Sequence, residues 1–122
     1  MKISEVSEKT GLSVDTLRFY EKIGLIEPPP RDDAGRRVYG PDILGWVRFL
    51  DQLNATGMKQ ADRISYAQLR VRGAQTYAAR RQMLEQHRES IRSQLARLQE
   101  TLALMDRKVA LYTELEKGSN DE

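Results

Sequence analysis

Apolar residues near the start of the chain recur at helical spacing and are interrupted twice by glycine. Ser4 can cap a first short helix, which ends near Thr10-Gly11. Ser13 can cap a second helix from Val14 to about Ile23, and Gly24 is its stop signal. Four apolar residues give the second helix one buried face: Leu12, Leu17, Tyr20 and Ile23. The pattern is typical of a helix-turn-helix, although ordinary helical hairpins share it.

The segment after the second helix is extended and then turns. The run Glu27-Pro28-Pro29-Pro30 cannot continue a helix. Asp33 and Gly35 are turn formers, and Arg37-Val38-Tyr39 has β propensity, so the sequence predicts a small β-hairpin. Its basic side chains can reach a phosphate backbone: Arg31, Arg36 and Arg37. A hairpin that follows a recognition helix is a wing; the alternative is a solvated surface loop.

Two further helices are predicted in the middle of the chain. Pro41 suits the first turn of a third helix that ends at Gly57, and the interior Gly45 suggests close packing against a neighbour. A fourth helix runs roughly from Lys59 to Val71, and its first residue makes a weaker cap than Ser or Thr. Trp46 can belong to an effector pocket, but we expect it to pack against the wing or the fourth helix.

The last part of the chain carries a seven-residue repeat. From Thr76 it meets no Pro or Gly before Gly118, which predicts a helix of about 40 residues, roughly 60 Å long. One seam position holds Tyr77, Leu84, Ile91, Leu98, Met105 and Tyr112, and the other holds Leu95, Leu102 and Val109. Arg81 and Arg88 take that second position in the early turns. The pattern predicts a dimeric coiled coil; packing onto the chain's own N-terminal part is the alternative.

Composition narrows the function classes. Hydrophobic residues make up 39% of the chain and charged residues 31%, which favours a folded helical protein over a disordered or membrane protein. No apolar run approaches the ~20 residues of a membrane span, so we expect no anchor or signal peptide and a cytoplasmic location. The formal net charge of +2 is too small to indicate nucleic-acid binding by itself.

The chain has no cysteine and a single histidine, His87. These counts exclude disulfides and thiolate chemistry within the chain and predict no metal site and no cofactor. The sequence also offers no nucleophile–base pair and no phosphate-cradling glycine loop, so we do not expect an enzyme.

Several blocks in roughly the first 70 residues resemble, in order and spacing, the N-terminal signature of the MerR family of transcription regulators. The blocks are Ile3-Ser4-Glu5-Val6, Thr10-Gly11-Leu12-Ser13, Thr16-Leu17-Arg18-Phe19-Tyr20-Glu21, Gly24-Leu25-Ile26 and Gly35-Arg36-Arg37-Val38-Tyr39. The resemblance implies a mainly α protein with a winged helix-turn-helix and a small β-hairpin wing, followed by a long dimerisation helix that pairs as an antiparallel coiled coil. Sequence alone leaves the orientation of the pair open.

The resemblance also implies a function. Such a protein binds a palindromic promoter as a homodimer and distorts the spacer so that RNA polymerase can read it. By position, the DNA-contacting residues of the family correspond to Val14, Thr16, Arg18, Tyr20, Arg36, Arg37 and Tyr39. Asp15 lies near the start of the same helix and is also placed to approach bases. A guanidinium at Arg18 can donate to a phosphate or to a guanine edge.

We therefore expect a DNA-binding domain at residues 1–72, a dimerisation helix at 73–118 and a disordered tail at 119–122. Cysteine-based sensing within the family does not apply to this chain. What remains is a small organic effector bound at the dimer interface, near Trp46, Tyr66, Tyr77 or Tyr112, or a regulator without an effector. A coiled-coil adaptor whose N-terminal part binds protein is the alternative from another class.

Overall fold

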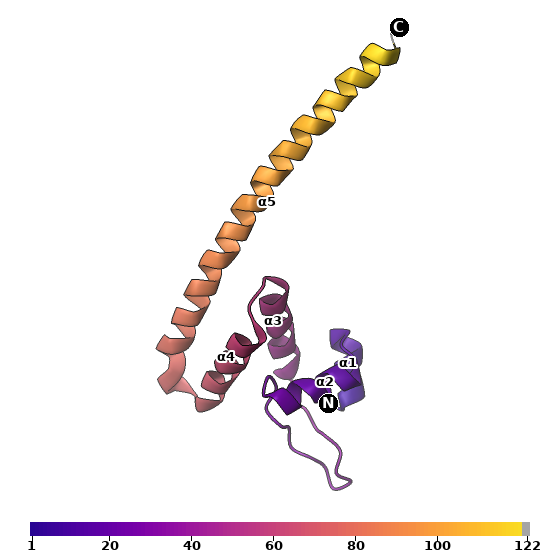
Figure 1. Cartoon of the computed structure of the whole chain (residues 1–122). Helices are drawn as coiled ribbons and strands as arrows, with labels where there is room; N and C mark the ends of the chain where they lie inside the picture. The colour runs from indigo at the N-terminus through magenta and orange to yellow at the C-terminus, as the bar shows by residue number, and fades with distance from the viewer. Residues whose placement is uncertain (121–122) are drawn as a thin grey trace. The chain divides into compact units, whose positions relative to one another are not determined.

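The computed structural model describes residues 1–120, and these residues are helical apart from turns and loops (Figure 1). The elements in chain order are α1 (Ile3–Thr10), α2 (Val14–Ile23), α3 (Ile43–Ala55), α4 (Gln60–Arg72), a short 3-10 turn (Ala74–Thr76) and α5 (Tyr77–Asn120). The chain divides into two units, Met1–Leu84 and the part from Glu85 onward. The mainly α prediction is confirmed.

The ends of α1 and α2 are set by local side-chain and backbone bonds. Ser13 caps α2 as predicted, because its Oγ accepts the backbone N–H of Thr16 at 3.0 Å. Gly24 ends the helix with φ +89°, a left-handed conformation that glycine adopts without strain. The cap predicted for α1 is wrong: its N-cap is Lys2, and Ser4 lies inside the first turn.

The middle helices follow the predicted pattern with three differences. α3 begins at Ile43 after Asp42 as N-cap, so Pro41 lies in the turn before the helix. Lys59 precedes α4 without a side-chain capping bond, which confirms the expected weak cap. The packing predicted at Gly45 is wrong, because a Cβ placed there meets nothing within 4 Å. Val71, where the sequence predicted the end of this helix, lies within α4 and is exposed.

The core of Met1–Leu84 is built from residues of all four helices, α1 to α4, and of the segment after α2. Its fully buried side chains are Val6, Leu17, Leu25, Ile26, Val47 and Leu50. Trp46 lies on α3 against α4: its ring stacks on Tyr66 with centroids 6.0 Å apart, and its Nε1–H donates to the Leu25 carbonyl at 2.8 Å. Packing against the fourth helix is thereby confirmed for Trp46.

The segment between α2 and α3 is a loop rather than a β-hairpin. A single antiparallel bridge joins Arg31 and Arg37, and no strand is formed within residues 1–120. The Asp32 carboxylate closes the tip by accepting the backbone N–H groups of Ala34 and Arg36. The prolines before the turn carry no N–H to donate to a ladder, which limits the strand pairing. The predicted β-hairpin is therefore corrected to a turn closed by one bridge; we call residues 27–39 the wing loop.

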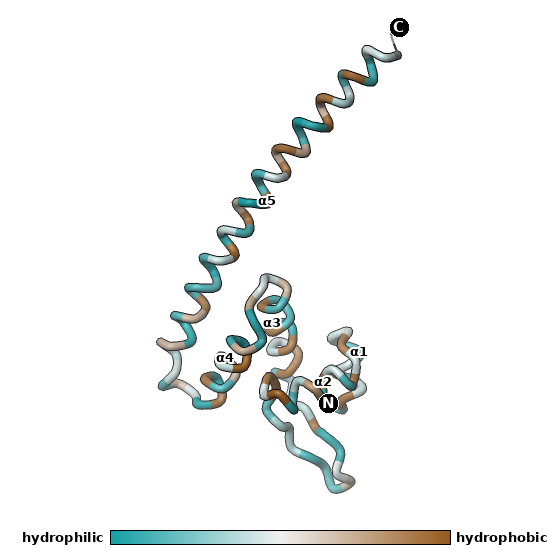
Figure 2. The backbone as a smooth tube through the Cα atoms, in the orientation of Figure 1, coloured by the Kyte–Doolittle hydropathy of each residue, from teal (hydrophilic) through white to brown (hydrophobic). Residues whose placement is uncertain are grey.

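α5 is a single helix through Asn120, so it runs past Gly118, where the sequence predicted its end. Ser119 and Asn120 of the expected tail belong to this helix, and residues 121–122 lie outside the described residues. Figure 2 shows hydrophobic bands recurring along α5 between hydrophilic ones. Within the part of the chain that the structure describes, no helix combines the length and hydrophobicity of a membrane span.

Candidate nucleic-acid interface

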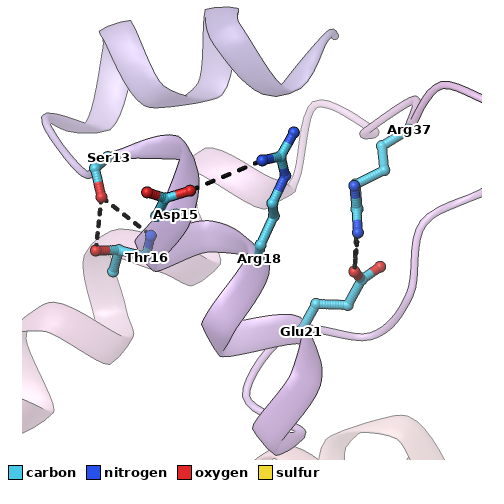
Figure 3. Close-up of polar contacts among 6 residues, drawn as sticks. All are labelled: Ser13, Asp15, Thr16, Arg18, Glu21 and Arg37. Carbon is cyan, nitrogen blue, oxygen red and sulfur yellow. Dashed lines mark hydrogen bonds and ion pairs between the residues drawn. The ribbon is translucent and has the colours of Figure 1, made fainter.

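α2 presents a polar surface opposite its buried side. Leu17 anchors the helix in the core with no exposed surface, while Asp15 and Arg18 point to solvent (Figure 3). The Arg18 guanidinium lies 3.8 Å from the Asp15 carboxylate. Both side chains are more than half exposed, so this ion pair is weak and does not withdraw Arg18 from solvent.

The N-terminal turn of α2 holds its short polar side chains in fixed positions. Ser13 donates its hydroxyl to Thr16 Oγ1 at 2.8 Å, in addition to accepting the Thr16 N–H. Val14 and Thr16 are half-buried, and Asp15 is exposed. These residues, predicted to face bases, therefore lie at one end of the helix with their backbone fixed by a cap.

A close ion pair joins α2 to the wing loop. Arg37 donates from Nε and Nη2 to the same Glu21 oxygen, at 3.0 and 2.8 Å (Figure 3). The side chains are 19% and 14% exposed, so water screens the pair poorly. The hydrogen bond that Arg37 donates to Glu21, partly opposed by burial, raises the pKa of Arg37 above its ordinary value. Sequence reasoning missed Glu21, because no periodicity connects residues 16 positions apart.

Tyr39, two residues after Arg37, is buried, with 3% of its surface exposed. Its hydroxyl oxygen is buried and has no hydrogen-bond partner among the described residues. Burial, aided by the negative charge of Glu21, raises the pKa of Tyr39, and the neighbouring arginines oppose this shift. Tyr20, from the same set of predicted residues, is half-buried on α2. Contact between the Tyr39 hydroxyl and a phosphate would require the hydroxyl to become exposed.

A hollow of about 370 Å³ lies between the start of α1, α2 and the wing loop. The basic side chains around it are Lys2, Arg18, Arg31, Arg36 and Arg37. This concentration of positive charge makes a local anion-attracting surface in a chain whose net charge is only +2. The structure thus brings the predicted Arg18, Arg36 and Arg37 together and adds Lys2, which the sequence analysis did not single out.

The four aromatic residues proposed for an effector do not form one cluster. Trp46 and Tyr66 are in contact, as described above. Tyr77 is exposed, with the Arg80 guanidinium 4.9 Å from its ring centre. Tyr112 is exposed on the part of α5 that belongs to the other unit.

A larger, mainly apolar hollow of about 710 Å³ borders Trp46 between the end of α2 and α4. Arg70 lies on its wall, 4.2 Å above the Trp46 ring centre and 3.7 Å from the Asp42 carboxylate. Tyr66, Tyr77 and Tyr112 are not among its lining residues. Residues 1–120 contain no group of three or more His, Cys, Asp or Glu side chains placed to hold a metal ion.

Comparison with known proteins identifies the class of protein that this fold belongs to. The family described as MerR family regulatory protein matches residues 2–39. An uncharacterized HTH-type transcriptional regulator of Haemophilus influenzae is 34% identical over 109 residues, which cover 89% of this chain and 81% of that protein. The HTH-type transcriptional regulator AdhR of Bacillus subtilis is 34% identical over 75% of this chain and 65% of its own length.

Two solved structures extend the similarity over most of the chain. A MerR family regulator from Listeria monocytogenes superposes with a TM-score of 0.86 at 37% identity, covering 92% of this chain and 85% of that one. HiNmlR, a MerR family regulator lacking the sensor domain, was solved bound to promoter DNA; its TM-score is 0.83 at 33% identity, with 93% and 90% covered.

The chain belongs to the MerR family of regulatory proteins. It is a helix-turn-helix transcriptional regulator, as the sequence predicted, and its relatives are regulators rather than enzymes. The alternative of a protein-binding adaptor finds no support among these relatives.

Proposed function

We propose that this protein binds palindromic promoter DNA as a homodimer, with α2 in the major groove and the wing loop against the flanking phosphates. The observation that carries the proposal is the basic hollow beside the exposed face of α2. A recognition helix reads base edges while neighbouring cations bind the backbone. The similar HiNmlR was solved bound to promoter DNA, which supports promoter DNA as the ligand of this chain. The residues proposed to form the DNA surface are Val14, Asp15, Thr16, Arg18, Tyr20, Arg36, Arg37 and Tyr39.

The dimer would form through α5, whose seam residues from Ile91 to Tyr112 are exposed in the single chain. In a parallel, in-register pair, Arg81, Arg88 and Glu116 would each face their own copy, which places like charges together. An antiparallel pair with Leu95 opposite the partner's Leu98 instead places Arg81 near the partner's Tyr112 and Glu116. Opposite charges and a cation–aromatic contact then replace the repulsions at Arg81 and Glu116, and Arg88 no longer faces its own copy. The charge pattern therefore supports the antiparallel arrangement.

This arrangement assigns residues 1–72 to DNA binding and residues 73–118 to dimerisation. Two DNA-binding units at opposite ends of a long helix pair can hold two half-sites of one promoter at a fixed spacing. As the family resemblance implies, the dimer would distort the spacer and so control reading by RNA polymerase in the cytoplasm.

The direct test is a footprint and gel-shift assay on the DNA upstream of the protein's own gene. We expect a protected palindrome whose affinity falls steeply as salt rises. Arg18→Ala should abolish the shift, while Arg92→Ala on the exposed side of α5 should leave it intact, because Arg92 pairs locally with Glu89. Equal binding by wild type and Arg18→Ala would contradict the assignment of α2.

Effector binding is a second candidate function, favoured by the apolar hollow beside Trp46. Its volume lies in the range of small-molecule sites, roughly 300–1,000 Å³, and Arg70 offers one cation for an acidic group. Trp46 is the chain's single tryptophan, so its fluorescence reports on this hollow directly. Quenching by one member of a panel of small organic acids would identify an effector; unchanged fluorescence across the panel would favour a regulator without one.

A further inference from the structure

The wing loop has hydrogen bonds of its own that close its tip, but these do not fix its direction relative to the helices. Within the loop, one bridge joins Arg31 to Arg37, and the backbone N–H of Val38 donates to the Pro30 carbonyl at 2.8 Å. Arg31 donates to the Gly35 carbonyl at 2.6 Å, which tightens the tip without connecting it to the helices. A turn of this kind, exposed along most of its length, needs contacts at its base to hold one orientation.

Hydrogen bonds tie the loop to the rest of its unit at two places, and the buried Tyr39 ring anchors the end of the loop in the core. At the end of the loop, Tyr39 and Met1 exchange backbone hydrogen bonds in both directions. Closer to the tip, Arg37 reaches Glu21 in the last turns of α2 with two N–H groups (Figure 3). This second contact connects the loop to the proposed recognition helix itself.

The adjacent arginines of the loop are therefore in different states. Arg36 is exposed at the rim of the basic hollow. Arg37 is mostly buried, and its Nε and Nη2 are committed to Glu21. A phosphate that took over these donors would leave the Glu21 carboxylate half-buried and without its counter-charge, which is unfavourable. Arg36 is therefore suited to contact a phosphate, and Arg37 is suited to hold the wing loop in place.

We propose that Glu21 is a positioning residue for DNA binding: through Arg37 it fixes the direction of the wing loop relative to α2, while Arg36 makes the phosphate contact. The proposal rests on the proposed function and revises the role of Arg37 within it. It also makes an unusual prediction of sign. Removing a negative charge near a DNA surface ordinarily strengthens binding, whereas loss of Glu21 should weaken it.

The first test measures affinity and its salt dependence on the duplex that the wild-type chain protects. Glu21→Gln and Arg37→Gln should each weaken binding about tenfold, with the wild-type slope of log affinity against log salt. The double variant should bind no worse than either single one, because both break the same contact. Arg36→Gln is the matched control: a dimer that loses two phosphate contacts should show a slope shallower by about 1.8.

The second test uses the full chain without DNA. Amide hydrogen exchange of Asp32, Gly35 and Val38 should become about tenfold faster in Glu21→Gln and Arg37→Gln and stay unchanged in Arg36→Gln. If Arg37→Gln fails to fold, Arg37→Lys replaces it. The lysine keeps the charge that a phosphate needs but loses the two-donor contact, so affinity should fall with an unchanged slope.

Three results would overturn the proposal: a shallower salt slope in Arg37→Gln or Arg37→Lys, unchanged or stronger binding by Glu21→Gln, or unchanged exchange in the loop. Absence of specific DNA binding by the wild-type chain would instead contradict the proposed function, and the exchange measurement would still decide whether Glu21 holds the loop.

Discussion

In Met1–Leu84, most large apolar side chains are buried or partly buried, and Val6, Leu17 and Leu50 have no exposed surface. In α5 beyond Leu84, residues of the same kind stay open: Leu98 is 67% exposed and Val109 65%. The hydrophobic bands along α5 in Figure 2 are therefore a surface, whereas those of α2 and α3 are a core. A helix without its own core depends on a partner. The contrast supports the proposed division, in which the first unit folds on its own core and α5 forms the dimer.

The largest expected effect comes from placing a charge in the α5 seam. Leu98→Asp should dissociate the dimer, because Leu→Ala at a buried position alone costs about 2–5 kcal/mol and the dimer carries two copies. Sedimentation should show monomers, and DNA affinity should fall at least a hundredfold. Ala96→Asp places the same charge about 200° around the helix and should stay dimeric. A dimeric Leu98→Asp variant would contradict the seam assignment.

A cavity in the first unit should destabilise the fold of that unit, whereas the charge in the α5 seam should dissociate the dimer. Leu17→Ala should lower the free energy of unfolding by about 3–5 kcal/mol, because the side chain is fully buried. Urea unfolding followed by Trp46 fluorescence measures this unit specifically, since Trp46 lies in its core. Leu104→Ala removes the same atoms from an exposed position on α5 and should change this transition by less than about 0.5 kcal/mol. Equal changes in the free energy of unfolding for the two variants would contradict the difference between the units.

A smaller effect on stability distinguishes Ser13, which caps α2, from Ser4, which the sequence suggested as a cap but which lies inside α1. Ser13→Ala should cost about 1 kcal/mol of stability, because the cap of α2 is lost. Ser4→Ala should leave the same thermal transition almost unchanged, since Ser4 lies in the first turn of α1 and makes no capping bond there. A matching loss from Ser4→Ala would restore the cap that the sequence predicted.

The smallest effect on stability at neutral pH is expected at Tyr39, and this effect depends on pH. Its hydroxyl is buried without a partner, so Tyr39→Phe should be neutral or stabilising by up to about 1 kcal/mol. The raised pKa means that the folded state holds the phenol proton more tightly than the unfolded one. Wild-type stability should therefore fall as pH rises past about 10, and Tyr39→Phe should lack this share of the fall. Unfolding curves of both proteins, measured from about pH 8 to about pH 11, check the difference.

The sequence predicted well what local chemistry determines. Ser13 begins α2 and Gly24 ends it, because an N-cap and a glycine in the left-handed conformation each act within a few residues. The heptad spacing predicted a continuous α5 for the same reason. The basic cluster was predicted in part, since Arg18 and Arg36 came from separate blocks of the family signature and only the fold brings them to one hollow.

What the sequence missed depends on contacts between distant residues or on competing backbone requirements. Arg37-Val38-Tyr39 has β propensity, but the preceding prolines lack N–H donors, so pairing stops at one bridge. The bond between Glu21 and Arg37 forms only when the loop folds back on α2. Gly45 indicated close packing, yet its surroundings are open, so nothing within residues 1–120 explains a glycine there.

The central claim is that the first unit binds DNA. α5 pairs with a second chain and so brings a second DNA-binding unit to the same duplex. Native mass measurement of the full chain mixed with its footprinted duplex tests both parts together. The account predicts two chains per duplex in wild type and a complex that weakens with salt, and it predicts no two-chain complex in Leu98→Asp. A single chain bound per duplex with full affinity, or binding that Leu98→Asp leaves unchanged, would contradict it.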